Sequence, residues 1–267
     1  MGALPACWSS TSSCSKRKFS FCPMTVLVMV RPTIEMGFEM AEFVITPSPQ
    51  VSVPVVGGGA FPVRRIYCVG RNYAEHAREM GHDPDAEPPF FFSKPADAIV
   101  TGGAPIPYPT ETSNLHYEIE LVAAIGTGGK GISVESALDH VWGYAVGIDF
   151  TRRDLQAWAK KAAKPWEVAK GFDHSAPISA LVAASALTPP LKGAIKLEVN
   201  GETRQSADIS DMIWDLPHVV AELSRYFELF PGDLIFTGTP AGVGAVVKGD
   251  RVTGSIAGVG SVETTIA

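Results

Sequence analysis

Two carboxylates separated by one residue are the first side chains in this sequence whose spacing indicates chemistry. They are Glu118 and Glu120, and a run of apolar residues follows them as far as Ile125. Because side chains at positions i and i+2 of a strand lie on the same face, the two carboxylates would stand side by side. Such a pair repels itself unless one group is protonated or a cation lies between them. The alternative is a solvent-facing pair on an edge strand.

A third carboxylate favours a metal site over the solvent-facing pair. Asp149 ends another apolar run, which begins at Tyr144, where a carboxylate is costly to bury without a partner. Three oxygen ligands of this kind suit Mg²⁺ or Mn²⁺ and leave coordination positions for water and substrate. The sequence therefore predicts a site for one of these ions at Glu118, Glu120 and Asp149.

A histidine and a glutamate three residues apart form the second candidate group. His76 and Glu79 lie in a segment that reads as a short helix, where positions i and i+3 are neighbours. A carboxylate beside an imidazole can orient its tautomer, so that the ring activates a water molecule. The alternative is a surface histidine beside a glutamate in a weak exposed pair.

Strands and a few helices must position these residues. Periodicity and turn residues predict strands over residues 51–56, 63–69, 118–126, 142–150, 234–237 and 251–266. Helices are predicted over residues 72–80, 151–163 and 215–230, with a short one from Ser133. The Asn200-Gly201 pair predicts a hairpin within residues 196–205. Strands outnumber helices without strict alternation, so we predict an α+β, β-rich fold rather than a doubly wound sheet.

Composition and charge exclude several classes of protein. The 267 residues are 46% hydrophobic and 19% charged, which is typical of a globular protein and not of a disordered one. The formal net charge of -6 argues against nucleic-acid binding, because no net positive field drives counterion release. No run approaches about 20 consecutive apolar residues, so no membrane span is predicted.

The first 39 residues differ from the rest of the chain. They contain three of the four cysteines, several serines, a basic cluster at residues 16–18 and an apolar run over residues 19–30. A signal peptide, an organellar transit peptide, and a disordered extension or misassigned start are the three interpretations. We predict the third for residues 1–39 and a single catalytic domain over residues 40–267. Because only Cys68 lies beyond the extension, we also expect a reducing, cytoplasmic location.

Several motifs, in the same order along the chain, resemble the signatures of the fumarylacetoacetate hydrolase superfamily. They are segment 68–76 with Glu79, the Glu118-x-Glu120 strand, segments 149–154 and 170–173, Asn200-Gly201-Glu202 with Gln205, and segment 237–240. Segments 88–95 and 164–167 are most similar to the bacterial fumarylpyruvate hydrolases of its acylpyruvate hydrolase branch. Residues 174–177, His-Ser-Ala-Pro, depart from the Phe-Cys-Pro type of continuation found in many relatives. That departure concerns substrate choice more than the metal site.

The resemblance implies a fold and a metal site. The fold is a mixed β-sandwich roll with short flanking helices, usually in a homodimer. The resemblance also implies that Glu118, Glu120 and Asp149 hold Mg²⁺ or Mn²⁺, which agrees with the interpretation from the residues alone.

The resemblance further implies roles for residues around that site. His76 and Glu79 would form the water-activating pair, on a helix that orders over the substrate. Lys170 would stabilise developing negative charge. The substrate contacts that it implies are Arg71, Gln205 and Thr239.

We therefore expect hydrolysis of a C–C bond in a small diketo acid, an acylpyruvate, with fumarylpyruvate giving fumarate and pyruvate. Two alternatives stay open. One is an oxaloacetate decarboxylase or an isomerase of the same superfamily, which needs no nucleophilic water. The other is a non-catalytic metal- or ligand-binding relative, against which the presence of both His76 and Glu79 argues.

Overall fold

The computed structural model describes residues 43–81, 88–187 and 192–267, and the predicted extension over residues 1–39 lies outside them. Residues 48–267 form one compact unit, and residues 43–47 belong to a separate one. No helix in the described part of the chain is long and apolar enough to cross a membrane. The site described below lies within residues 48–267.

A six-stranded sheet forms the centre of this unit. Its strand order is β11-β8-β7-β14-β3-β4, and only β14 and β3 pair in parallel. The strands are β3 (Arg65–Gly70), β4 (Phe90–Lys94), β7 (Ile119–Ile125), β8 (Val141–Ile148), β11 (Val182–Ala183) and β14 (Asp233–Phe236). Strand β7 lies in the middle of the sheet and every one of its residues is buried.

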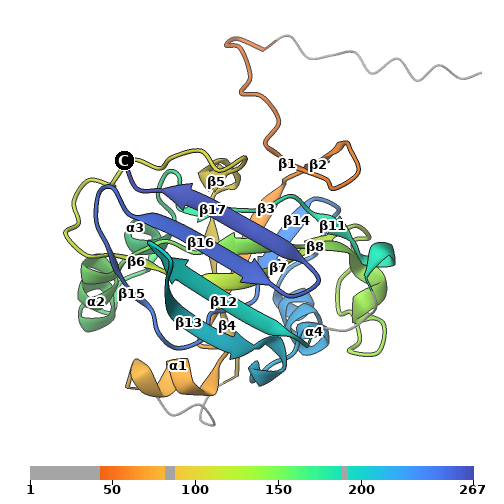
Figure 1. Ribbon diagram of the computed structural model, residues 1–267. Coiled ribbons are helices and arrows are strands. Elements are labelled where there is room, and N and C mark those ends of the chain that lie inside the picture. The colour runs from red at the N-terminus through yellow and green to blue at the C-terminus, as the bar shows by residue number, and fades with distance from the viewer. Residues whose placement is uncertain (1–42, 82–87, 188–191) are drawn as a thin grey trace, which may run out of the picture. The chain divides into compact units, whose positions relative to one another are not determined.

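A four-stranded antiparallel sheet packs against the first one, which makes the unit a β-sandwich (Figure 1). Its order is β13-β12-β16-β17, with bounds β12 (Ala194–Val199), β13 (Glu202–Asp208), β16 (Arg251–Ile256) and β17 (Gly260–Thr265). The core between the two sheets includes Ile119, Leu121 and Ile195. Asn200 and Gly201 both have positive φ, 53° and 81°, as the hairpin turn between β12 and β13 requires.

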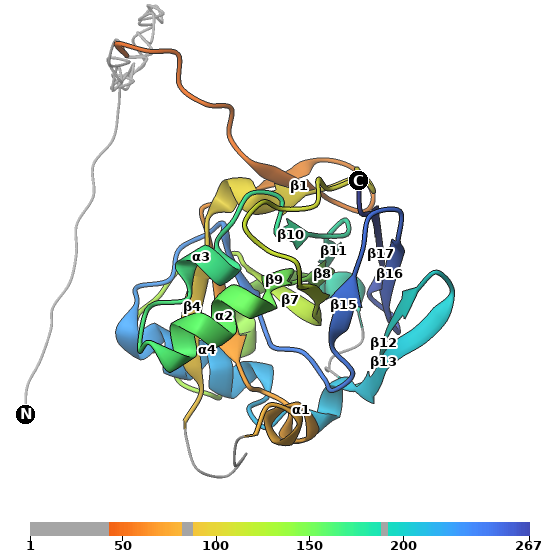
Figure 2. The same cartoon turned by 90° about the vertical axis from the view of Figure 1, so that its left-hand side faces the viewer.

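Smaller strands and short helices complete the unit. A three-stranded sheet contains β6 (Leu115–Tyr117), β9 (Thr151–Arg152) and β15 (Gly244–Val246), and two strand pairs join β1 (Ser52–Pro54) to β2 (Ala60–Pro62) and β5 (Ile99–Val100) to β10 (Ala176–Pro177). The helices are α1 (Ala74–Glu79), α2 (Arg153–Lys161), α3 (Glu167–Lys170) and α4 (Leu216–Tyr226). Short 3₁₀ turns cover Ala96–Ala98, Ala137–His140, Ala184–Ala186 and Ile209–Asp211. Figure 2 faces the end of the unit where α2 and α3 lie.

The α+β, β-rich class and the sandwich are confirmed, and three predicted elements are corrected. The helix expected over residues 215–230 ends at Tyr226, because Phe227 is extended and packs on Tyr67 with 5.1 Å between ring centroids. The strand expected over residues 251–266 is a hairpin that turns at residues 257–259. The short helix expected from Ser133 is the 3₁₀ turn Ala137–His140.

Substitution of Leu121 tests the core between the two sheets. Leu121→Ala should lower the free energy of unfolding by about 2–5 kcal/mol, because this fully buried side chain leaves a cavity in the middle strand. Urea denaturation followed by tryptophan fluorescence measures the change. The control is Val247→Ala, whose side chain is 62% exposed and which should change stability by less than about 0.5 kcal/mol. Equal losses of unfolding free energy in the two variants would contradict the placement of Leu121 in the core.

Candidate active site

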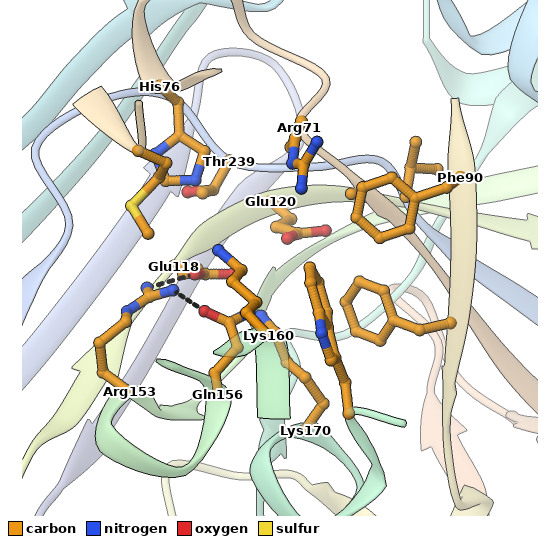
Figure 3. A pocket seen from close by; sticks show the side chains of 15 residues that line it. Arg71, His76, Phe90, Glu118, Glu120, Arg153, Gln156, Lys160, Lys170 and Thr239 are labelled. Atoms are coloured by element: carbon orange, nitrogen blue, oxygen red, sulfur yellow. Dashed lines mark hydrogen bonds and ion pairs between the residues drawn. The ribbon is translucent and has the colours of Figure 1, made fainter. Parts of the chain in front are cut away.

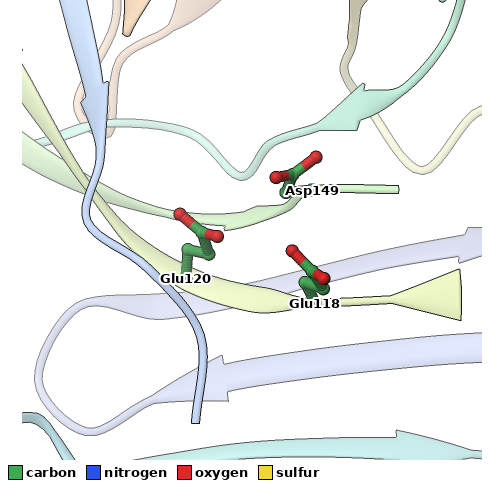
Figure 4. A group of neighbouring side chains, drawn as sticks. All are labelled: Glu118, Glu120 and Asp149. Atoms are coloured by element: carbon green, nitrogen blue, oxygen red, sulfur yellow. The ribbon is translucent and has the colours of Figure 1, made fainter. Parts of the chain in front are cut away.

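Three carboxylates meet where β7 and β8 lie side by side. Glu118 lies between β6 and β7, at the point where the chain passes from the three-stranded to the six-stranded sheet, and Glu120 follows within β7. Asp149 directly follows β8, and its backbone N–H donates to the Glu118 carbonyl at 2.8 Å. Ligand oxygens of the three side chains all lie within 4.8 Å of one another, and the three residues are buried. Figure 4 shows Glu118 and Glu120 next to each other along the chain, with Asp149 beside them.

Buried cations surround this carboxylate cluster. Lys170, at the end of α3, donates from Nζ to Glu118 Oε2 and to Asp149 Oδ2, each at 2.6 Å. Arg153, the first residue of α2, donates from Nη2 to Glu118 Oε1 at 2.5 Å. Lys94, at the end of β4, lies 2.7 Å from Asp149 Oδ1. Two carboxylates of the cluster therefore have ion-pair partners, which buried charges need.

The three carboxylates differ in how the protein holds their charge. Burial alone would raise the pKa of Glu118, but Lys170 and Arg153 outweigh burial and hold it below its ordinary value. The pKa of Glu120 is raised well above its ordinary value by burial and by the charges of Asp149 and Glu118. The hydrogen bond that Glu120 accepts from the backbone N–H of Gly238, at 2.8 Å, opposes this shift without cancelling it. Glu120 is therefore the carboxylate that most needs a further positive charge.

The cluster fits a divalent metal ion. All of its ligand atoms are carboxylate oxygens, which are the ligands that Mg²⁺ and Mn²⁺ prefer. A cation among the three groups would remove the repulsion that raises the Glu120 pKa. The structure thus brings Glu118, Glu120 and Asp149 together as the sequence predicted.

The predicted histidine–glutamate pair forms on α1. His76 Nδ1 lies 3.1 Å from Glu79 Oε2, and because the carboxylate only accepts, Nδ1 carries the proton and Nε2 is left as the basic nitrogen. Burial lowers the pKa of His76, although the charge of Glu118 and the hydrogen bond to Glu79 oppose the effect. Glu79 also accepts a bond from the backbone N–H of Gly242 at 3.3 Å. This bond connects α1 to the loop that follows β14.

One pocket contains most of the predicted site residues (Figure 3). Its lining includes six of them: Arg71, His76, Glu118, Glu120, Lys170 and Thr239. The other lining residues are Val69, Gly70, Met80, Phe90, Phe92, Arg153, Gln156, Lys160 and Trp166. His76 of α1 and the carboxylates of Glu118 and Glu120 therefore line a common pocket.

Gln205 and Lys170 differ in how they lie relative to this pocket. Gln205, expected to contact substrate, is fully buried and is not among the residues that line the pocket. Its amide accepts from the Ile119 N–H at 3.0 Å and donates to Thr239 Oγ1 and the Pro240 carbonyl at 2.8 Å, so it positions the loop that carries Thr239. Lys170 does line the pocket, but its ammonium group is ion-paired with two carboxylates of the cluster.

Residues 65–267 match the family model described as Fumarylacetoacetate (FAA) hydrolase C-terminal. The chain belongs to this family. The resemblance seen in the sequence motifs is thereby confirmed, and the sandwich with short flanking helices is the fold of the family's solved structures.

Several members of the fumarylacetoacetate hydrolase family are similar over most of their length. The crystal structure of fumarylpyruvate hydrolase from Pseudomonas aeruginosa, in complex with Mn²⁺ and pyruvate, is 54% identical, with a TM-score of 0.83 over 85% of this chain and 99% of that one. A fumarylpyruvate hydrolase of a Ralstonia species is 44% identical over 69% of this chain and 95% of its own. The mitochondrial oxaloacetate tautomerase of Bos taurus is 42% identical over 73% of this chain and 88% of its own.

Reasoning from the sequence missed several residues of this family member's site. Lys94 and Arg153 balance the carboxylates, and Gln156, Lys160 and Trp166 line the pocket. Lys94 had a usable signal, since a charge at the end of the apolar run Phe90–Phe92 is costly to bury without a partner. The residues of α2 had a weaker one: Arg153, Gln156 and Lys160 recur at helical spacing and so share one face.

Glu120→Gln tests the metal site without an activity assay. The variant should keep or gain stability in the absence of metal, because it removes one of three mutually repelling buried carboxylates. It should lose most of the stabilisation by Mn²⁺, which for the unaltered chain is about 2.7 kcal/mol at a hundredfold excess over Kd. Thermal unfolding with Mn²⁺ and with EDTA measures both effects.

The control for this substitution is Glu202→Gln, an exposed carboxylate at the start of β13. It should respond to Mn²⁺ as the unaltered chain does. Undiminished stabilisation of Glu120→Gln by Mn²⁺ would show that Glu120 is not a ligand.

Proposed function

We propose that this protein is a divalent-metal-dependent hydrolase that cleaves a C–C bond in an acylpyruvate, with fumarylpyruvate as substrate and Mg²⁺ or Mn²⁺ as cofactor. The observation that carries the proposal is the shared pocket, in which His76, oriented by Glu79, faces Glu118 and Glu120. The identity of 54% to a fumarylpyruvate hydrolase that binds Mn²⁺ and pyruvate supports it.

The three carboxylates supply a site for the α-keto acid end of the substrate. A divalent cation held by Glu118, Glu120 and Asp149 would polarise the ketone groups and favour the enolate of pyruvate as the leaving group. Lys170 and Arg153 keep Glu118 ionised, and Lys94 and Lys170 pair with Asp149. These ion pairs fix the carboxylates before substrate binds, so that little reorganisation is left to the reaction.

His76 supplies the water-activating base. Its unprotonated Nε2 would take a proton from a water molecule while the oxygen of that water bonds to the acyl carbonyl carbon. Cleavage of the C–C bond then leaves the acyl group as a carboxylic acid, and the departing pyruvate carbon takes up a proton that His76 can return. Glu79 holds the ring orientation and stabilises the imidazolium formed between the two proton transfers.

Turnover of fumarylpyruvate tests the proposal directly. Loss of the ultraviolet absorbance of the diketone should depend on Mg²⁺ or Mn²⁺ and should yield equal amounts of fumarate and pyruvate. Oxaloacetate is the comparison substrate, because a relative at 42% identity is an oxaloacetate tautomerase and the family also includes an oxaloacetate decarboxylase. Conversion of oxaloacetate without cleavage of fumarylpyruvate would overturn the proposal. The expected homodimer stays a prediction that light scattering checks.

The pH dependence tests the role of the His76–Glu79 pair. Because burial lowers the pKa of His76, kcat/KM should fall only as pH drops below the ordinary histidine value of about 6.5. Glu79 raises the pKa of His76, so Glu79→Gln should move this acid limb to still lower pH. The plateau should fall by about 10²-fold or more, because the ring loses its orienting partner.

The matched control is Glu75→Gln, an exposed carboxylate on the same helix. It should leave both the acid limb and the plateau close to those of the unaltered chain. An acid limb that Glu79→Gln does not move would show that another group is the base.

A further inference from the structure

The cations that line the pocket differ in the number of ion pairs that they form with other residues. Lys170 is ion-paired with Glu118 and Asp149, and Arg153 donates to Glu118 and to Gln156 Oε1. Lys160 lines the same pocket, yet none of the described carboxylates forms an ion pair with it. Its positive charge is therefore available to an anion that enters the pocket.

The surroundings of Lys160 are positively charged and aromatic. Its Nζ lies 5.2 Å from the centre of the Trp166 ring, and Trp166 packs edge-on against Phe90 at 5.1 Å between centroids. Burial and the charges of Arg153, Arg71 and Lys170 lower the pKa of Lys160 to about 8, and the charge of Glu118 opposes this shift without cancelling it. A partly buried ammonium group near two guanidinium groups is stabilised by any carboxylate that binds beside it.

Arg71 approaches the pocket from the opposite wall. Figure 3 shows its guanidinium group descending from the end of β3, while Lys160 rises from α2 below. Arg71 has a φ of 60°, a left-handed conformation that is strained for a non-glycine residue and is concentrated at functional sites. Its guanidinium carbon lies 5.2 Å from the centre of the Phe90 ring. Arg71 over Phe90 and Lys160 over Trp166 thus lie in the same pocket as the carboxylate cluster.

We propose that Lys160, with Arg71 opposite, binds the carboxylate at the far end of the acyl chain, so that the site selects acylpyruvates that end in a second carboxylate. This inference rests on the proposed function, because it takes the α-keto acid end of the ligand to lie at Glu118, Glu120 and Asp149. Lys160 then determines specificity without taking part in bond cleavage. Substrates with an uncharged acyl end would lack this contact.

Two keto acids of equal length test the inference by binding alone. 2-Oxopimelate and 2-oxoheptanoate share the α-keto acid end and the chain length, and they differ in ending with a carboxylate or a methyl group. Isothermal titration of the Mg²⁺-loaded protein should show 2-oxopimelate binding about 10- to 100-fold more tightly, the range of a charge-assisted hydrogen bond. Lys160→Met should reduce this preference at least tenfold, and Lys160→Arg should keep most of it.

The control for helix integrity is Lys161→Met, the exposed neighbour at the end of α2. It should keep the full preference for 2-oxopimelate. The inference is overturned if the unaltered protein binds both acids equally. It is also overturned if Lys160→Met weakens the binding of both acids by the same factor, because Lys160 would then contact the α-keto acid end that they share.

Kinetics separate this inference from the proposed function. Lys160→Met should lower kcat/KM for fumarylpyruvate mainly through KM, and it should change that for acetylpyruvate, which has an uncharged acyl end, by less than about threefold. A preference for 2-oxopimelate that depends on Lys160, in a protein that cleaves neither diketone, would refute the hydrolase but keep the carboxylate site. Cleavage of both diketones with no effect of Lys160→Met would support the hydrolase but refute the carboxylate site at Lys160.

Discussion

Charge balance around three buried carboxylates is the constraint on which the rest of this structure depends. Glu118, Glu120 and Asp149 lie within a sandwich where an uncompensated charge would be strongly unfavourable. Cations from three separate elements form ion pairs with these carboxylates: Lys94 from β4, Arg153 from α2 and Lys170 from α3. Each cation satisfies one or two carboxylates and at the same time fixes its own element against β7 and β8. The ion pairs that prepare the metal site therefore also hold the pocket walls in place.

The site combines a rigid part with a part held by fewer contacts. The carboxylates lie within or directly beside β7 and β8, strands in the middle of the sheet whose two faces are covered by the core. His76 and Glu79 belong to a helix of six residues, which Glu79 connects to the loop after β14 through the Gly242 N–H. Gly242 has a φ of 96°, and a Cβ there would lie 2.2 Å from the Arg204 carbonyl. The approach of this loop thus requires glycine, and the placement of the base depends on it.

Local spacing was enough to predict the chemistry but not the partners that support it. Glu118 and Glu120 could be predicted to share a face because a strand alternates its side chains, and Asp149 because it ends an apolar run. The ion pairs of Lys94 and Arg153 could not, since they join segments whose proximity only the sandwich creates. The end of α4 at Tyr226 likewise depends on a residue distant in sequence, Tyr67, whose ring contacts Phe227. The inward position of Gln205 depends on its hydrogen bond to Thr239, in a loop 34 residues further along the chain.

Helix α2 carries three pocket residues on one face, and their spacing along the helix is what brings them to the same pocket. Arg153, at its first turn, holds the carboxylate of Glu118, and Lys160 lies seven residues further on. With a rise of about 1.5 Å per residue, that separation is about 10 Å along the helix axis. One face of the helix thus carries both a residue that holds a carboxylate of the cluster and a second cation that lines the same pocket. One residue inserted between Arg153 and Lys160 would turn Lys160 by about 100° away from the pocket. The presence of both cations in one pocket therefore depends on the helical register of α2.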